Sequence, residues 1–219
     1  MNLDFRLYLI TDRKVTSKPL PEAVRSALEG GVKAIQLREK DLPVRDLLAL
    51  ARELRSITRE FGAKLFINDR VDVAMAVGAD GVHLGHQSMP VEAVRKIVGT
   101  GLLIGVSTHN AEEAIAAQVG GADFITFGPI FETPSKAGII TPVGPKAIRN
   151  VKNEINIPLF GLGGIKSGNM LQAMSAGADG IAMISAIFGS EDIRKTAAAF
   201  TKALTAISKV VCTDSCAPR

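Results

Sequence analysis

Four similar segments recur along the sequence, and their spacing limits the folds that the chain can adopt. The segments are GGVKAIQL (30–37), VGADGVHL (77–84), GGADFITF (120–127) and AGADGIAM (176–183). The glycines Gly31, Gly78, Gly121 and Gly177 stand 47, 43 and 56 residues apart, a period that suits two strand–helix units. Each glycine follows a helical pattern, where a positive φ is usually required.

Four further apolar runs lie between these segments, and helical patterns separate all eight. The additional runs are RLYLIT (6–11), KLFIND (64–69), LIGVST (103–108) and IPLFGLGG (157–164). Between the runs, apolar residues recur at intervals of three and four, the period of an amphipathic helix. Eight strands alternating with eight helices require a parallel sheet and predict an α/β fold, a TIM (β/α)8 barrel. An open doubly wound sheet is the alternative.

Composition agrees with one barrel domain over residues 1–208. Hydrophobic residues make up 47% of the 219 residues and charged residues 22%, which excludes general disorder. For residues 209–219 we expect a flexible tail, in which Cys212 and Cys216 are free thiols in a reducing compartment. The sequence shows no apolar window of about 20 residues and no signal peptide, so we expect a cytoplasmic protein that does not bind membranes.

The net charge of +4 comes without a basic run and with few aromatic residues, so we expect no nucleic-acid binding. A mildly basic enzyme with small anionic substrates fits better. The sequence leaves the oligomeric state open, and a homo-oligomer is compatible with it.

In a TIM barrel, catalytic side chains follow the carboxyl ends of the strands. After the second expected strand, alternation places Gln36, Arg38 and Lys40 on one side, and Leu37 and Glu39 on the other. Arginine supplies a planar fork and lysine a point charge for an anion. We therefore interpret this strand end as an anion site, with a solvated salt-bridge surface as the alternative.

Two more strand ends carry polar residues that suit a ligand. Asn68 and Asp69 follow the third strand, where they either cap the next helix or provide an oxygen ligand for Mg²⁺. Ser107 and Thr108, near the end of the fifth strand, either cap a helix or donate to a ligand. The histidines are interpreted as structural because they lack the spacing of a metal-binding motif; they are His83, His86 and His109.

The longest loop follows the sixth strand and runs from Gly128 to Gly144. Its Thr133, Ser135 and Lys136 suit a phosphate, and a loop of this length is often a functional lid. The seventh and eighth strands end in glycine-rich or short polar turns at 161–165 and 183–187, where barrels often bind phosphate. Two anion regions at one barrel mouth predict a reaction that joins two anionic substrates.

In order and spacing, these motifs resemble the thiamine phosphate synthase family over about residues 6–205. The shared motifs are QLREK (36–40), ND (68–69), GVHLG (81–85), GVSTH (105–109), GPIFETPSK (128–136), GLGGI (161–165) and MISAI (183–187). The resemblance implies a transferase of thiamine biosynthesis on a TIM barrel. Such an enzyme joins a hydroxymethylpyrimidine diphosphate to a thiazole phosphate and releases pyrophosphate, with Mg²⁺ as cofactor.

The resemblance also assigns roles by position. It places the pyrimidine diphosphate at Gln36, Leu37, Arg38, Glu39, Lys40, Asn68, Ser107 and Lys136. It places the thiazole phosphate at Thr133, Pro134, Ser135, Gly164, Ile184 and Ser185, and Mg²⁺ at Asp69. The resemblance further implies that pyrophosphate leaves first and that the thiazole nitrogen then captures the pyrimidine carbocation. On this basis Lys136, Arg38 and Lys40 are the expected catalytic residues, which take up charge on the leaving group.

The sequence departs from the family pattern after the fourth strand, where Ser88 replaces a second magnesium carboxylate; this predicts weaker or altered Mg²⁺ binding. Glu132 stands where proline is typical, as in the related thiazole tautomerase, although Pro129 replaces the histidine of that enzyme. The tautomerase and a non-catalytic barrel that binds thiamine precursors are therefore the alternatives. The complete set of expected diphosphate-binding residues favours the synthase.

Overall fold

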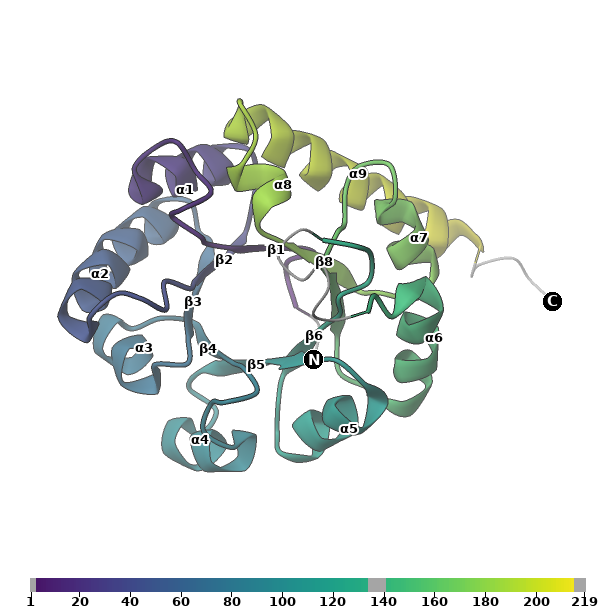
Figure 1. The fold of residues 1–219 in the computed structure, drawn as a ribbon, viewed down its shortest axis with the longest axis horizontal. Coiled ribbons are helices and arrows are strands. Elements are labelled where there is room, and N and C mark those ends of the chain that lie inside the picture. Colours follow the sequence, from purple (N-terminus) through teal and green to yellow (C-terminus); the bar gives the residue numbers. More distant parts are fainter. Residues whose placement is uncertain (1–2, 134–140, 215–219) are drawn as a thin grey trace.

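Over residues 3–133 and 141–214, the part of the chain that this computed structural model describes, eight parallel strands close into a barrel in sequential order (Figure 1). The strands are β1 (Leu7–Ile10), β2 (Ala34–Leu37), β3 (Lys64–Asn68), β4 (Gly81–Leu84), β5 (Leu103–Thr108), β6 (Phe124–Phe127), β7 (Leu159–Leu162) and β8 (Gly180–Met183). The predicted TIM barrel is confirmed, and the open doubly wound sheet is excluded.

Helices surround the barrel and cover the outer face of its strands (Figure 1). They are α1 (Leu20–Glu29), α2 (Val44–Glu60), α3 (Val71–Val77), α4 (Val91–Val98), α5 (Ala111–Val119), α6 (Gly144–Glu154), α7 (Met170–Ser175), α8 (Ser185–Phe188) and α9 (Ile193–Asp214). Each expected helix is present, and the short α8 is an addition to the expected set.

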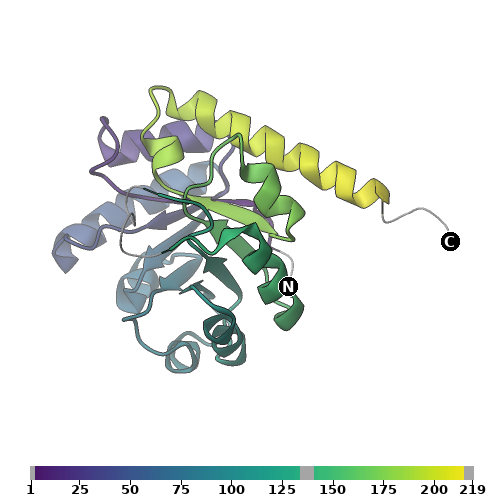
Figure 2. The same ribbon diagram turned by 45° about the vertical axis from the view of Figure 1, so that its right-hand side comes forward.

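The long helix α9 packs beside α1, where Arg194 lies 3.8 Å from Glu29, and its carboxyl-terminal end extends past the barrel (Figure 2). The helix continues beyond residue 208 as far as Asp214. It includes the backbone of Cys212, whereas Cys216 lies outside the described residues. Within the described ranges, none of the helices is both long and apolar enough to span a bilayer.

The recurring segments form equivalent turns at the amino-terminal end of the barrel. Gly31, Gly78, Gly121 and Gly177 all have a positive φ, of 91°, 60°, 94° and 105°, as their place after a helix predicts. The GAD aspartates that follow three of these glycines each bind a cation of a helix and a backbone N–H of the preceding strand. The contacts are Asp80 with Arg55 and Leu65, Asp123 with Arg95 and Ile104, and Asp179 with Lys152 and Leu159, all at 2.6–2.8 Å.

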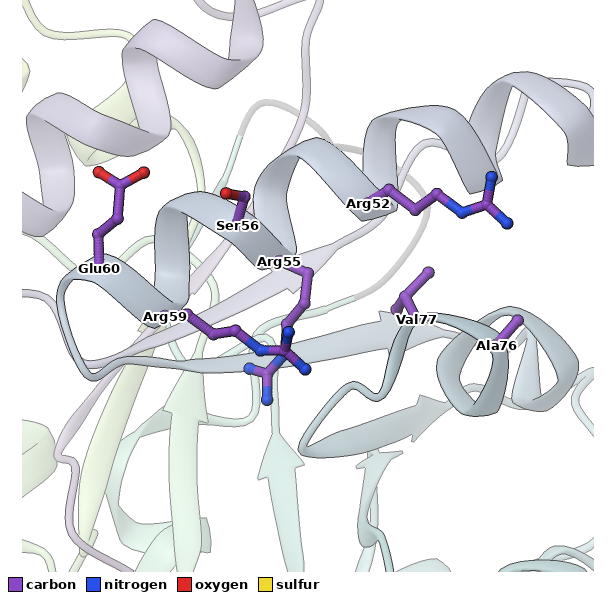
Figure 3. A pocket seen from close by; sticks show the side chains of 7 residues that line it. All are labelled: Arg52, Arg55, Ser56, Arg59, Glu60, Ala76 and Val77. Atoms are coloured by element: carbon purple, nitrogen blue, oxygen red, sulfur yellow. The ribbon is translucent and has the colours of Figure 1, made fainter.

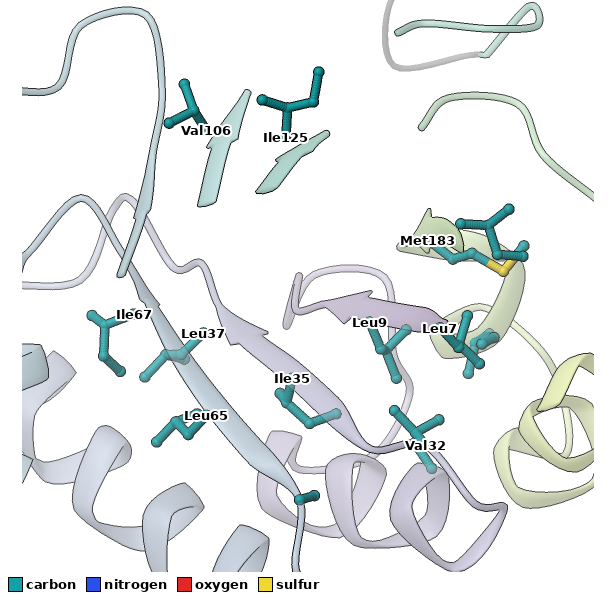
Figure 4. Close-up of a cluster of buried hydrophobic side chains, with 14 of the residues drawn as sticks. Leu7, Leu9, Val32, Ile35, Leu37, Leu65, Ile67, Val106, Ile125 and Met183 are labelled. Carbon is teal, nitrogen blue, oxygen red and sulfur yellow. The ribbon is translucent and has the colours of Figure 1, made fainter. Parts of the chain in front are cut away.

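Apolar side chains fill two separate regions because successive residues of a strand face opposite sides. Between strands and helices lies an aliphatic shell that includes Leu9, Ile35 and Ile67 (Figure 4). Inside the barrel lies an aromatic floor, defined as Phe5, Tyr8, Phe66, Phe124 and Phe160.

In the aromatic floor the ring of Tyr8 packs edge-on against Phe66 and Phe124, with centroids 5.2 Å and 5.4 Å apart. Glycines of neighbouring strands make room for them: a Cβ at Gly105 would lie 2.4 Å from Cζ of Phe124. The floor therefore fills the amino-terminal half of the barrel, and polar side chains are left to line the carboxyl-terminal half.

Candidate active site

Polar side chains from neighbouring strands meet at the carboxyl end of the barrel. Strands β2 and β3 pair through Leu37 and Ile67, so the next residues, Arg38 and Asn68, lie side by side at this end. Arg38 is half-buried, and its backbone N–H donates to Oγ1 of Thr11 at 2.9 Å. Arg38 therefore stands at the carboxyl end of the barrel, directly after β2.

A chain of hydrogen bonds crosses the inside of the barrel just above the aromatic floor. Nε2 of Gln36 donates to Oη of Tyr8 at 3.2 Å, and Oη of Tyr8 lies 3.2 Å from Nδ1 of His83. Nε2 of His83 then lies 3.0 Å from Oγ of Ser107, and Thr126 contacts both His83 and Ser107 at 3.4 Å. Five strands thus contribute one polar layer, and the predicted inward direction of Gln36 is seen directly.

The two ring residues of this layer are neutral because they are buried. Tyr8 is 0% exposed and His83 2% exposed. Burial raises the pKa of Tyr8 well above its usual value of 10.0, against a smaller lowering by the hydrogen bond from Gln36. Burial lowers the pKa of His83, and the nearby positive charge of Arg38 adds to this shift, so that the pKa falls to about 3.

Leu37 and Glu39 lie on the other side of the strand, as alternation predicts. Leu37 packs in the aliphatic shell. Glu39 is only 6% exposed, and its carboxylate accepts hydrogen bonds from Oγ1 of Thr11 at 2.7 Å and from Nη1 of Arg13 at 3.0 Å. Arg13 also binds Asp41 at 2.6 Å. The side chain of Glu39 therefore ties the loop after β1 to β2 and does not join the inner layer, while Lys40 is exposed at the end of this segment.

Asp69 has an unusual backbone conformation directly after β3. Its φ is +63°, the one positive value for a non-glycine residue in the described part of the chain. Two backbone hydrogen bonds hold it there: its N–H donates to the carbonyl of His83 in β4 at 2.9 Å, and its carbonyl accepts from the N–H of Val71, the first residue of α3, at 3.1 Å. Such strained residues concentrate at functional sites, and the side chain of Asp69 is exposed.

The donor set suits a magnesium ion that the substrate helps to bind. Among the side chains that the structure describes, those of residues 3–133 and 141–207, no three from His, Cys, Asp or Glu gather closely enough to hold a metal by themselves. Mg²⁺ commonly takes one or two carboxylates and completes its coordination with phosphate oxygens and water. Asp69 fits this arrangement. Ser88, at the position of the expected second ligand, accepts the N–H of Gly85 at 2.7 Å and fixes the turn after β4.

The loops after β6 and β7 are held together by their backbones. The N–H of Ile130 donates to the carbonyl of Leu162 at 2.9 Å, and a Cβ at Gly164 would lie 2.3 Å from the carbonyl oxygen of Glu132. Gly164 also has a φ of +63°. Only glycine fits this close approach, so the backbone at Gly164 is firmly placed.

The remaining predicted residues of the second anion region lie on the adjacent segments. Ser185 is exposed at the start of α8, Ile184 packs partly against the inner aromatic cluster, and Thr133 is half-buried. Pro134, Ser135 and Lys136 lie outside the described residues.

A separate cavity of about 450 Å³ lies on the outer flank of the barrel between α2 and α3 (Figure 3). It is lined by Arg52, Arg55, Ser56, Arg59, Glu60, Ala76 and Val77. Two of its charged lining residues form ion pairs, Arg55 with Asp80 and Glu60 with Arg25. None of the predicted site residues lines this cavity, and it is not at the carboxyl ends of the strands.

Sequence reasoning missed Tyr8 and Thr126 as members of the polar layer, and it interpreted His83 only as a structural histidine. Their alternation along each strand was the available signal, because each lies two residues from another inward-facing residue of its strand: Ile10 for Tyr8, Gly81 for His83 and Phe124 for Thr126. A polar side chain at such a position needs a partner across the barrel.

A closed barrel with polar side chains gathered at the carboxyl ends of its strands is the architecture of a TIM-barrel enzyme. Residues 7–187 match the sequence profile of the thiamine monophosphate synthase family. The chain therefore belongs to this family and is an enzyme of the thiamine-phosphate synthase type, a transferase of thiamine biosynthesis.

Individual relatives agree with the family assignment. A protein of Geobacter sulfurreducens is 54% identical, with 90% of this chain and 93% of the relative covered. The thiamine-phosphate synthase of Halalkalibacterium halodurans is 46% identical, with coverages of 92% and 96%. The solved structure of thiamine phosphate pyrophosphorylase from Pyrococcus furiosus superposes with a TM-score of 0.85 at 41% identity, covering 93% of this chain and 96% of that one.

Proposed function

We propose that this enzyme joins a hydroxymethylpyrimidine diphosphate to a thiazole phosphate in the presence of Mg²⁺, forming thiamine phosphate and pyrophosphate. One observation carries the proposal: the strained, exposed Asp69 directly follows β3, beside the strand end that carries Arg38. A carboxylate and a guanidinium carried by two neighbouring strand ends suit a diphosphate that is bound together with its metal ion.

The residues of β2, β3 and β5 would bind the pyrimidine diphosphate. Arg38, Lys40 and Lys136 would take up negative charge as the diphosphate leaves, which is the main electrostatic task of such a reaction. Mg²⁺ at Asp69 would offset further charge on the same group. Asn68 and Ser107 would supply neutral hydrogen bonds, and no protein nucleophile is required.

Gln36 would contact the pyrimidine, because the bond from its Nε2 to Tyr8 fixes the side-chain amide plane, while the side-chain oxygen Oε1 makes no hydrogen bond within the described residues. Leu37 and Glu39 would support this region from the outer side. Glu39 does so by holding the loop that carries Arg13.

The thiazole phosphate would bind at the loops after β6, β7 and β8. The tight contact of Gly164 with the loop of Glu132 holds this turn in place, and backbone N–H groups of such a fixed turn can bind an anion. Ile184 and Ser185 would border it on one side, and Thr133, Pro134 and Ser135 on the other. The two substrates would then react across the mouth, and their positioning would supply much of the rate.

A single assay tests this function. The purified protein is mixed with Mg²⁺, the pyrimidine diphosphate and the thiazole phosphate, and thiamine phosphate and pyrophosphate are measured. We expect both products in equal amounts and their loss when a chelator is added. A folded protein that gives no product, but isomerises a thiazole carboxylate phosphate, would overturn the proposal in favour of the tautomerase.

A further inference from the structure

The hydrogen-bond chain inside the barrel has a direction that its donors determine. The amide nitrogen of Gln36 can only donate, so Oη of Tyr8 accepts that bond. The hydroxyl hydrogen of Tyr8 then needs an acceptor. Nδ1 of His83 is the remaining partner of Oη within the described part of the chain, so Tyr8 donates to Nδ1. The opposite direction would leave a buried hydroxyl hydrogen without an acceptor, which native structures avoid.

This direction fixes the tautomer of His83. A neutral imidazole carries one N–H, and its other nitrogen is an acceptor. Because Nδ1 accepts from Tyr8, the proton is on Nε2, which donates to Oγ of Ser107 at 3.0 Å. The pKa of His83, lowered to about 3 by burial, agrees with a neutral ring.

The tautomer of His83 determines which hydrogen bonds are left to the half-buried Ser107 near the end of β5. Its oxygen accepts from His83 and, at 3.4 Å, from Oγ1 of Thr126. The hydroxyl hydrogen of Ser107 is therefore left to donate, and no acceptor for it is found within the described residues.

We propose that Tyr8 and His83 are positioning residues that hold the Ser107 hydroxyl as a hydrogen-bond donor directed at an acceptor atom of the substrate. This inference rests on the proposed function, in which Ser107 binds the pyrimidine diphosphate. It predicts that the site selects an acceptor, such as a phosphate oxygen or an aromatic ring nitrogen, at this point.

The tautomer can be measured without any catalytic assay. In protein labelled with ¹⁵N at its three histidines, long-range ¹H–¹⁵N correlation spectra distinguish a proton on Nδ1 from one on Nε2, and His83→Gln identifies the signal. We expect the Nε2–H form in the unmodified protein. A proton on Nδ1 would overturn the proposal, whatever the enzyme catalyses.

Variants of the aromatic floor test the cause of the tautomer. Tyr8→Phe keeps the ring and removes the hydroxyl, so we expect His83 to lose its single tautomer. Phe66→Leu is the matched control, since its ring lies 5.2 Å from that of Tyr8 and makes no hydrogen bond. A single Nε2–H form in Tyr8→Phe would contradict the proposed direction.

Steady-state kinetics test whether the hydrogen-bond chain from Tyr8 acts through Ser107. We expect Tyr8→Phe to lower kcat about fivefold with KM nearly unchanged, and to have almost no further effect in a Ser107→Ala background. An equal loss in both backgrounds would mean a merely structural role and would overturn the proposal. His83→Gln, which keeps an N–H donor near Ser107, should retain more of kcat than His83→Leu.

The failure of the two proposals is distinguishable. If the unmodified protein makes no thiamine phosphate, the proposed function fails. The histidine spectrum still reports whether the hydrogen bonds from Gln36 to Ser107 run in the inferred donor-to-acceptor direction. If the protein is an active synthase but His83 carries its proton on Nδ1, only the positioning inference fails.

Discussion

Replacing Asp69 with glycine, alanine and asparagine separates the role of its backbone from the role of its carboxylate. With φ at +63°, a residue with a Cβ is disfavoured by about 1–2 kcal/mol. Glycine avoids this cost but loses about 0.5–1 kcal/mol through the greater freedom of the unfolded chain. We therefore expect Asp69→Gly to be more stable than Asp69→Ala by about 0.5–1 kcal/mol, the reverse of the order at an ordinary position.

Urea unfolding measures this difference in the free energy of unfolding. In thermal unfolding the same difference corresponds to about 1–4 °C in Tm for a chain of this size. Asp69→Asn serves as the matched variant for chemistry, because asparagine also tolerates a positive φ but carries no charge. It should unfold like the unmodified protein while losing Mg²⁺-dependent turnover by about 100-fold or more. If alanine proves more stable than glycine, the backbone is not strained. If Asp69→Asn keeps its Mg²⁺-dependent rate, Asp69 does not bind the metal.

Three further experiments test the rest of the site. Ser88→Asp should reduce the Mg²⁺ concentration needed for half-maximal rate, whereas the control Ser88→Asn should not. Equal Mg²⁺ titrations for the two variants would mean that position 88 does not face the metal. Arg38→Ala and Lys136→Ala should each lower kcat by about 100-fold or more with unchanged unfolding midpoints, and near-normal rates would refute the diphosphate site. Gly164→Ala would force a Cβ to within 2.3 Å of the carbonyl oxygen of Glu132. We therefore expect KM for the thiazole phosphate to rise about tenfold. An equal rise in KM for both substrates would argue against a separate thiazole phosphate site.

Much of the fold could be predicted because the period of the pattern is a local property of the chain. The apolar runs and the helical repeats identify each strand and each expected helix without knowledge of their neighbours. Gly31 and Gly177 were likewise predictable as residues with a positive φ, since they follow helices. The same local rule does not extend to α8, a single turn of four residues that is too short to show a helical period.

The candidate site was predictable only as a set of strand-end positions. Alternation correctly separates Gln36 and Arg38 from Glu39, but it does not reveal that Glu39 is buried against Arg13, because that contact comes from the neighbouring loop. In the same way, Asp69 is conspicuous in the sequence as a polar residue after a strand. Its positive φ follows from a hydrogen bond to β4, which forms only when the sheet is assembled.

The sequence by itself determined the alternation of strands and helices that makes this an α/β protein, favoured a closed barrel over an open sheet, and identified the polar groups that stand where the strands end. Only the tertiary structure decided which inward residues meet. Tyr8, His83 and Ser107 come from three strands, and Tyr8 and His83 are 75 residues apart in the chain. Their contact depends on the stagger of the strands when the barrel closes. A two-residue period specifies the face on which a side chain lies, whereas closure of the barrel brings it to its partner.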